Sequence, residues 1–418
     1  MRRTIATMAL LSLVACSSST SATQQSASAM QQSASATQTI TFAISGLGSE
    51  GQYTEAQVSE FEKLHPNIHV AVEALSSDST VFLSQVDDAF AAGFSTPDLV
   101  ESDITYTAEW AAAGYLQPVN CPPGQFNRGM ISTGRYQGKQ YSCPWFLNVE
   151  GLWYRTDLVP APPQTAQQVA SDAEQAVSTD HQLKEGIAFE GDKYEGEITA
   201  YMMLDKAFGG SLSLSDVDTR QNVAALQFLH SLIYQDHVAP SDVLAYQEGQ
   251  TGSDFADGYA AFAINWPYVA SLSLAPAVKG HVGFIPFPPG PGGSPGVALG
   301  GEVLSINAKT PHLAAVNELI DFLTSPAQET ARAAAVADAP ARPAAYTPAL
   351  LASSPIFKAV QAMAPIAAAR PVTPEYLNVS ADLQDLISSA YANPGQSAAS
   401  GAFKTYVGTI AIDSDTAS

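Results

Sequence analysis

The chain has 418 residues, of which 46% are hydrophobic and 14% are charged. This composition is typical of a folded protein large enough for two domain cores, and it excludes an intrinsically disordered chain. The formal net charge of −22 disfavours binding to nucleic-acid phosphates and to anionic lipid surfaces, because the protein surface would repel both.

The N-terminus has the layout of an export signal. Arg2 and Arg3 precede a short apolar stretch that cannot span a bilayer. The Leu-Val-Ala-Cys sequence that ends at Cys16 resembles a bacterial lipobox, which implies a signal peptide of residues 1–15 and a lipid on Cys16. An ordinary cleaved signal is the alternative. Residues 16–38, almost all Ser, Ala, Thr or Gln, predict a flexible tether, so we expect a chain anchored outside the bacterial cytoplasmic membrane.

Strand and helix patterns alternate in the first part of the body. The expected strands are 38–45, 68–73 and 98–101, and the expected helices are 52–64, 80–92 and 108–113. This alternation predicts a parallel α/β sheet with right-handed crossovers.

An aromatic, apolar run over 138–158 follows. Two strand-like segments, 140–146 and 151–155, flank a polar insert that includes Asn148 and Glu150. Polar side chains between buried segments need partners or a cavity. We expect the run to link two lobes, with Asn148 in the cleft between them and Glu150 facing solvent at the hinge.

The rest of the chain reads as a second α/β block followed by a mostly helical end. The expected helices are 165–177, 198–208, 220–236, 311–324 and 327–337, and the expected strands are 186–189, 258–265, 281–287 and 301–307.

Two cysteines remain after Cys16. An exported location permits a disulfide between Cys121 and Cys143, which would stabilise the fold by about 3 kcal/mol. Two separately buried thiols are the alternative.

The common cofactor motifs do not fit. Residues 46–51 match GxGxxG, but Glu50 would place a negative charge where a pyrophosphate should bind. Glu50 is instead a candidate acceptor for ligand hydroxyl groups. The sequence contains no GxxxxGK[ST], HExxH, GxSxG or metal-spaced Cys/His set, so we expect neither a cofactor nor a metal.

Acidic and aromatic residues gather near predicted strand ends. The acids are Asp103, Glu150, Glu248 and Glu302, and the aromatic residues are Tyr106, Trp145, Trp153, Trp266 and Tyr268. Aromatic rings that stack on sugars, together with carboxylates that accept hydroxyl protons, make a carbohydrate cleft. Trp153 is expected to pack in the core. An exported glycoside hydrolase that uses two of the acids is the enzyme alternative.

Several segments carry a family likeness. The segments 97–103, 109–118, 138–158, 255–267, 299–302 and 340–346 resemble, in order, motifs of the family 1 extracellular solute-binding proteins of ABC importers. The likeness covers roughly residues 40–390 and is nearest to the trehalose- and maltose-binding lipoproteins.

The resemblance implies an α/β fold of two lobes, the type II periplasmic-binding-protein-like fold, with three chain crossings. The implied lobes are 39–146 with 285–337, and 147–284 with 338–418; the later crossings would lie near 277–284 and 337–342. The residues that match the family's sugar contacts are Glu50, Asp103, Asn148, Glu248, Trp266, Gly301 and Arg342. Glu302 stands where some relatives have Trp, and Asn148 stands where others have Asp.

The implied function is capture of an α-linked disaccharide, trehalose- or maltose-like, and its delivery to an ABC permease. We therefore expect a monomeric binding protein without catalytic activity or nucleic-acid partners. The alternative ligands within the same fold are an oligosaccharide, a glycerophosphodiester or a polyol.

Overall fold

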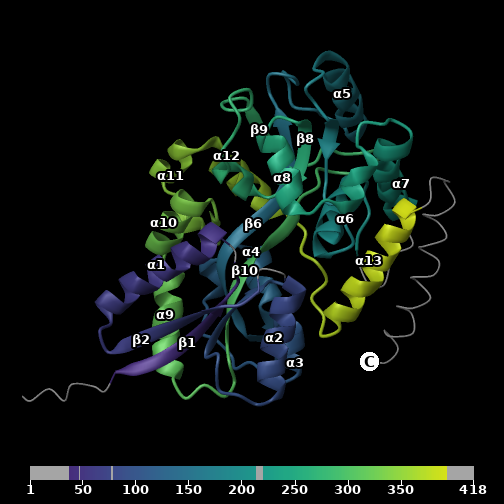
Figure 1. Cartoon of the computed structure of the whole chain (residues 1–418). Helices are drawn as coiled ribbons and strands as arrows, with labels where there is room; N and C mark the ends of the chain where they lie inside the picture. The colour runs from purple at the N-terminus through teal and green to yellow at the C-terminus, as the bar shows by residue number, and fades with distance from the viewer. Residues whose placement is uncertain (1–36, 47, 77–78, 213–219, 393–418) are drawn as a thin grey trace, which may run out of the picture. The chain divides into compact units, whose positions relative to one another are not determined.

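A computed structural model describes residues 37–392 of the chain, except 47, 77–78 and 213–219. The expected signal peptide, the Cys16 that we expect to carry a lipid, and almost all of the expected tether lie outside the described residues. The body is a mixed α/β structure (Figure 1). No helix in the described ranges is long and apolar enough to cross a membrane.

The strands are β1 (Gln38–Ile44), β2 (Ile68–Ala74), β3 (Leu99–Asp103), β4 (Arg135–Tyr136), β5 (Lys139–Gln140), β6 (Ser142–Arg155), β7 (Glu185–Ala188), β8 (Ala260–Asn265), β9 (Val282–Ile285), β10 (Ala298–Ile306) and β11 (Ala339–Pro340).

The helices are α1 (Gly48–Leu64), α2 (Ser79–Ala91), α3 (Thr107–Ala112), α4 (Arg128–Thr133), α5 (Ala166–Thr179), α6 (Glu195–Ala207), α7 (Arg220–Tyr234), α8 (Glu248–Ala256), α9 (Leu313–Leu323), α10 (Pro326–Val336), α11 (Pro348–Ser353), α12 (Pro355–Met363) and α13 (Tyr376–Ala392). Helix starts follow local chemistry. The Ser325 hydroxyl accepts from the Gln328 N–H, and Pro326 takes the first helical position of α10.

The main sheet has the order β2-β1-β3-β10-β6-β8-β7, and β9 and β11 also pair with β6. The prediction of a parallel sheet is correct for β2, β1 and β3. The later strands β10 and β6, which lie outside this prediction, are antiparallel to their neighbours. Neither strand is part of a βαβ unit, and β6 alone pairs with two groups of strands.

Strand β6 is continuous over 14 residues, so the two predicted segments and their polar insert form a single strand. Its first part pairs with β10 and β11, and its last part, from Gly151, pairs with β8 and β9. We call β1, β2, β3, β10 and the first part of β6 the first strand group, and β7, β8, β9 and the last part of β6 the second. Figure 1 shows β6 running from one group to the other.

Apolar side chains fill both groups. In the first group, Phe42, Trp145 and Leu304 are fully buried in the largest cluster, which also contains the buried Trp153. The expectation that Trp153 packs in the core is confirmed. In the second group, β7 and β8 pack with α5, α6, α7 and α13 in a separate cluster. The strands that carry the polar residues therefore rest on rigid cores.

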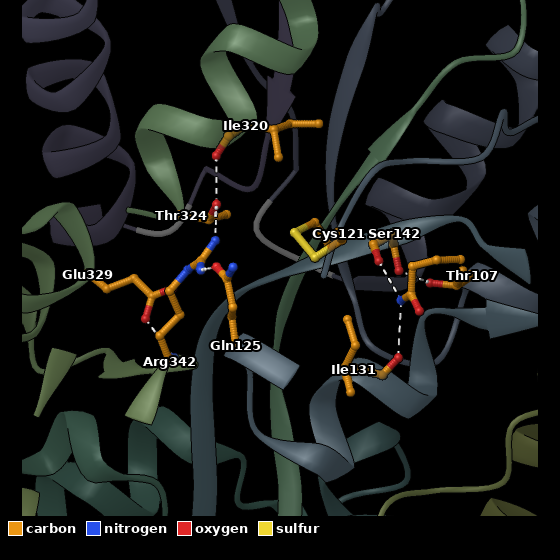
Figure 2. Close-up of a disulfide and its surroundings, with 11 residues drawn as sticks. Thr107, Cys121, Gln125, Ile131, Ser142, Ile320, Thr324, Glu329 and Arg342 are labelled. Atoms are coloured by element: carbon orange, nitrogen blue, oxygen red, sulfur yellow. Dashed lines mark hydrogen bonds and ion pairs between the residues drawn. A yellow bond between two sulfur atoms is a disulfide. The ribbon is translucent and has the colours of Figure 1, made fainter. Parts of the chain in front are cut away.

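The expected disulfide is present between Cys121 and Cys143, whose Cα atoms are 5.5 Å apart (Figure 2). Both cysteines are buried, and Cys143 lies in β6. The bond therefore ties the loop before α4 to the first part of the connecting strand.

Replacing both Cys121 and Cys143 with alanine is expected to lower the free energy of unfolding by about 3 kcal/mol, because the bond closes a loop of 22 residues in the unfolded chain. Urea unfolding measures the loss, and the parent protein under reducing conditions should show a similar one. A loss below about 1 kcal/mol would mean that the bond adds little to the fold.

Candidate functional site

Polar side chains share one face of the sheet where β3, β10 and β6 run side by side. Glu302 lies opposite Asp103 on β3 and opposite Phe146 on β6, while Gly300 lies opposite Asn148. Paired residues point to the same face, and so do residues two apart on one strand. Asp103, Asn148 and Glu302 therefore point the same way, and Glu150, two residues beyond Asn148, does too. We call this surface the acidic face.

Trp266 covers part of the acidic face. A side-chain Cβ placed on Gly300 would come within 2.7 Å of the Trp266 ring, so the half-buried indole lies against Gly300, beside Asn148. Trp266 follows β8, and its backbone N–H donates to the Asn265 side chain at 2.7 Å. Trp266, which follows a strand of the second group, thus lies over β10, a strand of the first group.

Tyr268 and Glu248 are also held at this end of β8. The Tyr268 hydroxyl and the Asn265 amide both donate to the Glu248 carbonyl, at 2.6 and 3.0 Å. Burial raises the pKa of Tyr268 above its ordinary value, and the carboxyls of Glu190 and Glu50 raise it further. Carboxyls from both strand groups therefore lie close to this phenol.

Gly301 has a backbone φ of 118°, which L side chains rarely adopt. A Cβ at this position would also come within 2.3 Å of the Phe146 carbonyl oxygen. The position therefore needs glycine for the close pairing of β10 with β6. Its predicted contact with ligand stays a prediction.

The first strand group adds a set of partly buried acids. Burial raises the pKa of Glu302 well above its ordinary value, and the carboxyls of Glu101 and Asp103 add to the effect. Burial also raises the pKa of Glu50, in the first turn of α1, and the neighbouring Asp338 raises it further. For the more deeply buried Glu101, burial raises the pKa to about 7.

Two arginines balance only part of this charge. Arg332 pairs with Asp338 at 2.7 Å, and both side chains are almost fully buried. Arg370 donates to Asp103 at 2.6 Å and to Glu195, at the start of α6, also at 2.6 Å. Only 4% of Arg370 is exposed, so this guanidinium links β3 to a helix packed on the second strand group.

The contacts of Glu195 extend this link. The Tyr376 hydroxyl donates to one Glu195 oxygen, and the Ser380 hydroxyl donates to the other at 2.6 Å. Sequence reasoning missed Arg370 and Glu195. One sequence signal could have pointed to Arg370. Acids greatly outnumber bases in this chain, so each basic residue is a candidate partner for the acids, and Arg370 stands just before Pro371, ahead of the last described helix.

The expectation that Glu150 faces solvent is wrong, because its side chain is fully buried. Glu150 lies two residues after Asn148 on β6 and so points to the same acidic face. At this end of the face, other parts of the protein cover it. Burial raises its pKa to about 8, and the Glu248 carboxyl adds to the effect. Glu190, which follows β7, is also fully buried; its pKa is raised well above the ordinary value by burial and then by Glu150.

Arg342 makes contacts outside this set; Figure 2 shows it beside Gln125, Thr324 and Glu329. Its guanidinium donates to Gln125 and, at 3.3 Å, to Thr324, and it lies 3.9 Å from the Phe126 ring centre. Its backbone N–H donates to Glu329 at 2.7 Å. None of these partners is a predicted site residue, whereas Arg370 contacts the acidic face directly. The predicted contact of Arg342 with ligand stays a prediction.

The remaining predicted residue, Tyr106, is close to the acidic face but buried. The Asp103 and Glu195 carboxyls both contribute to its raised pKa, after burial itself. No group of side chains in the described ranges has the make-up of a metal site. The chemistry available is therefore hydrogen bonding by carboxyls, an amide and a guanidinium beside a stacking ring.

The buried acids give a testable dependence of stability on pH. The folded-state pKa of Glu150, about 8, lies above the unfolded value of about 4.3, so the folded chain holds the extra proton between these values. This contribution to stability is complete below about pH 4 and is lost as pH rises through about 8. We expect the free energy of unfolding to fall from pH 6 to pH 8 by about 1.4 kcal/mol per pH unit for each proton released.

Urea unfolding at a series of pH values measures this slope. Glu150→Gln should flatten it, whereas the same change at the exposed Glu73 should not. A stability that rises over this range, or an equal slope in both variants, would contradict the assignment.

Two groups of strands connected through the shared strand β6, with polar and aromatic side chains gathered where the groups meet, define a solute-binding protein. The chain belongs to the bacterial extracellular solute-binding protein family, whose model matches residues 45–330. Family membership implies a location outside the cytoplasm.

Individual proteins agree with this assignment. A probable ABC transporter-binding protein of Deinococcus radiodurans is 30% identical over 302 residues, which cover 68% of this chain and 71% of the relative. The maltose-bound MalE3 of T. maritima superposes with a TM-score of 0.82 and 29% identity over 90% of this chain and 99% of that one. A solute-binding protein from Thermotoga lettingae with bound α-D-tagatose has a TM-score of 0.79 and 23% identity over 90% and 99% of the two chains. The expected two-lobe type II fold is confirmed.

Proposed function

We propose that this protein captures an α-linked disaccharide, trehalose- or maltose-like, and delivers it to the permease of an ABC importer. The observation that carries the proposal is the Trp266 ring lying against Gly300 beside the acidic face. An indole offers a flat apolar surface to a sugar ring, and carboxyl and amide groups next to it accept and donate hydrogen bonds to hydroxyls. The maltose-bound relative, at 29% identity, supports a sugar as ligand.

The proposed capture uses hinge closure. Asp103, Glu302 and Glu50 would bind the sugar from one lobe, and Trp266 and Glu248 from the other, with Asn148 on the connecting strand. A ligand that contacts both lobes stabilises the closed state, which the permease would recognise. We keep the lobe boundaries proposed from the sequence; the pairing of β6 with both strand groups supports the first crossing.

The cellular setting is part of the proposal. Cleavage before Cys16 and a lipid on that residue would hold a monomeric receptor near its permease by a flexible tether. The likeness to a protein described as ABC transporter-binding supports the permease partner.

A thermal-shift panel tests the ligand class, using trehalose, maltose, ribitol, glycerol-phosphate diesters and monosaccharides. At a free ligand concentration about 100-fold above its Kd, the stabilisation should be about 2.7 kcal/mol. We expect trehalose or maltose to shift the unfolding temperature. The acidic face should exclude the phosphodiesters, because it would repel their charge. No shift with either disaccharide would overturn the proposed ligand.

We also propose that the protein has no hydrolytic activity. Its family members are described as solute-binding proteins, and the Asp103 carboxyl of the acidic face is engaged by Arg370. Incubation with trehalose or maltose should release no glucose. Turnover that a single carboxyl-to-amide change abolishes would support the hydrolase alternative instead.

A further inference from the structure

The acidic face holds more carboxyl groups than its own cations can pair. Asp103 has Arg370, and Asp338 has Arg332. Glu302 lies directly opposite Asp103 on the neighbouring strand, yet no described residue donates a hydrogen bond to its side chain or forms an ion pair with it. Carboxyls in such a cross-strand pair repel each other when both are ionised. The half-buried Glu302 is therefore open to an outside partner that brings a positive charge.

Glu150 provides a second, independent observation. Its side chain is fully buried on the same face, close to the Thr199 hydroxyl and the equally buried Glu190, but neither of its oxygens has a hydrogen-bond partner in standard geometry within the described part of the chain. The same is true of Glu190, the nearby acid at the end of β7. A buried acceptor without a donor is costly. Acids without hydrogen-bond donors are therefore found both beside Trp266 and further along β6.

A neutral sugar relieves this shortage poorly. Each hydroxyl supplies one neutral donor, whereas a protonated amine supplies three donors and a charge. Hydrogen bonds with an ionised donor or acceptor are about twice as strong as neutral ones, so the amine keeps this strength even toward a carboxyl that is protonated part of the time. The Trp266 ring beside the face would add a favourable cation–π contact. A metal ion is a poorer candidate, because the described side chains form no metal-type group.

We propose that the physiological ligand is an amino sugar, a disaccharide-sized carbohydrate whose protonated amine is received by Glu302 with Asp103 and Glu50. The inference rests on the proposed function, because it names the class of sugar for the same site. The amine would take the place of a proton shared among these acids, so binding releases protons from the protein. Affinity for the amine therefore rises with pH until the amine itself loses its proton.

The test compares trehalose with its four mono-amino derivatives, in which an amine replaces the hydroxyl at position 2, 3, 4 or 6. Isothermal titration calorimetry on the full chain near pH 7 should show at least one derivative binding about tenfold or more tighter than trehalose. That advantage should shrink near pH 5, as the acids take up protons. Titrations in buffers with different ionisation enthalpies should show proton release for the tight derivative.

Glu302→Gln should lower the affinity for the tight amino derivative by about tenfold and change the affinity for trehalose far less. Glu73→Gln, an exposed acid-to-amide change at the end of β2, should leave both affinities unchanged. If Glu302→Gln does not fold, as its melting curve would show, Glu50→Gln takes its place. If trehalose binds and no derivative binds tighter, the inference is wrong and the proposed function stands. If neither trehalose nor maltose nor any derivative binds, the proposed function itself fails.

Discussion

Replacing Arg370 with methionine is expected to lower the free energy of unfolding by about 3 kcal/mol, because breaking a buried ion pair leaves its partners uncompensated. The guanidinium donates to Asp103 and Glu195 at 2.6 Å each, and methionine keeps most of the length of the side chain without its charge. Asp103 lies on β3 in the first strand group, and Glu195 lies on α6, which packs on the second. The loss should therefore also make the lobes less firmly joined.

Urea unfolding measures this effect, with Arg128→Met as the matched control at an exposed arginine. Arg370→Lys keeps the charge but cannot reach both carboxyls as a fork, so it should lose an intermediate amount. Combining Arg370→Met with Glu195→Gln should cost less than the sum of the single changes, because the two residues interact. Equal stability of the parent protein and the Arg370→Met variant would show that the link is energetically neutral.

Replacing Trp266 with alanine is expected to weaken disaccharide binding by about 30-fold or more, which corresponds to about 2 kcal/mol for a central aromatic contact. The indole is half-buried, and it lies on Gly300 without filling a core, so the fold should tolerate the change. Trp266→Phe should retain part of the affinity, because a smaller ring still stacks.

Titration calorimetry with the best disaccharide of the panel measures the loss. Phe94→Ala is the matched control, since Phe94 is 59% exposed and is not a predicted site residue. If Trp266→Ala leaves the affinity unchanged, the sugar does not bind at Trp266 beside the paired strands β6 and β10.

Local patterns predicted the elements well and their pairing poorly. The β-branched run of β1 and the helix–strand alternation after it gave the correct order of the first elements, because hydrophobic periodicity is a local property. The directions of β6 and β10 depend on pairing between residues far apart in the chain, which periodicity does not contain. Helix α8 escaped prediction because glycine and polar residues make up most of it.

The site shows the same division. The resemblance placed Glu50, Asp103, Asn148, Trp266 and Glu302 at positions that the fold brings near one another. It could not show that Glu150 is buried, because residues 148–150 were expected to interrupt two strands. Only the single strand β6 puts Glu150 on the same face as Asn148. It also did not point to Arg370, which reaches Asp103 from a segment whose contacts spacing cannot predict. Its choice of Arg342 as a ligand contact stays a prediction.

The most direct test of the account is a crystal structure of the full chain with the best-binding disaccharide. We expect the sugar between the two lobes, with one ring stacked on Trp266 and hydroxyl groups within hydrogen-bond distance of Asp103 or Glu302. A sugar bound elsewhere, or bound between the lobes without touching Trp266 or the acidic face, would contradict the account.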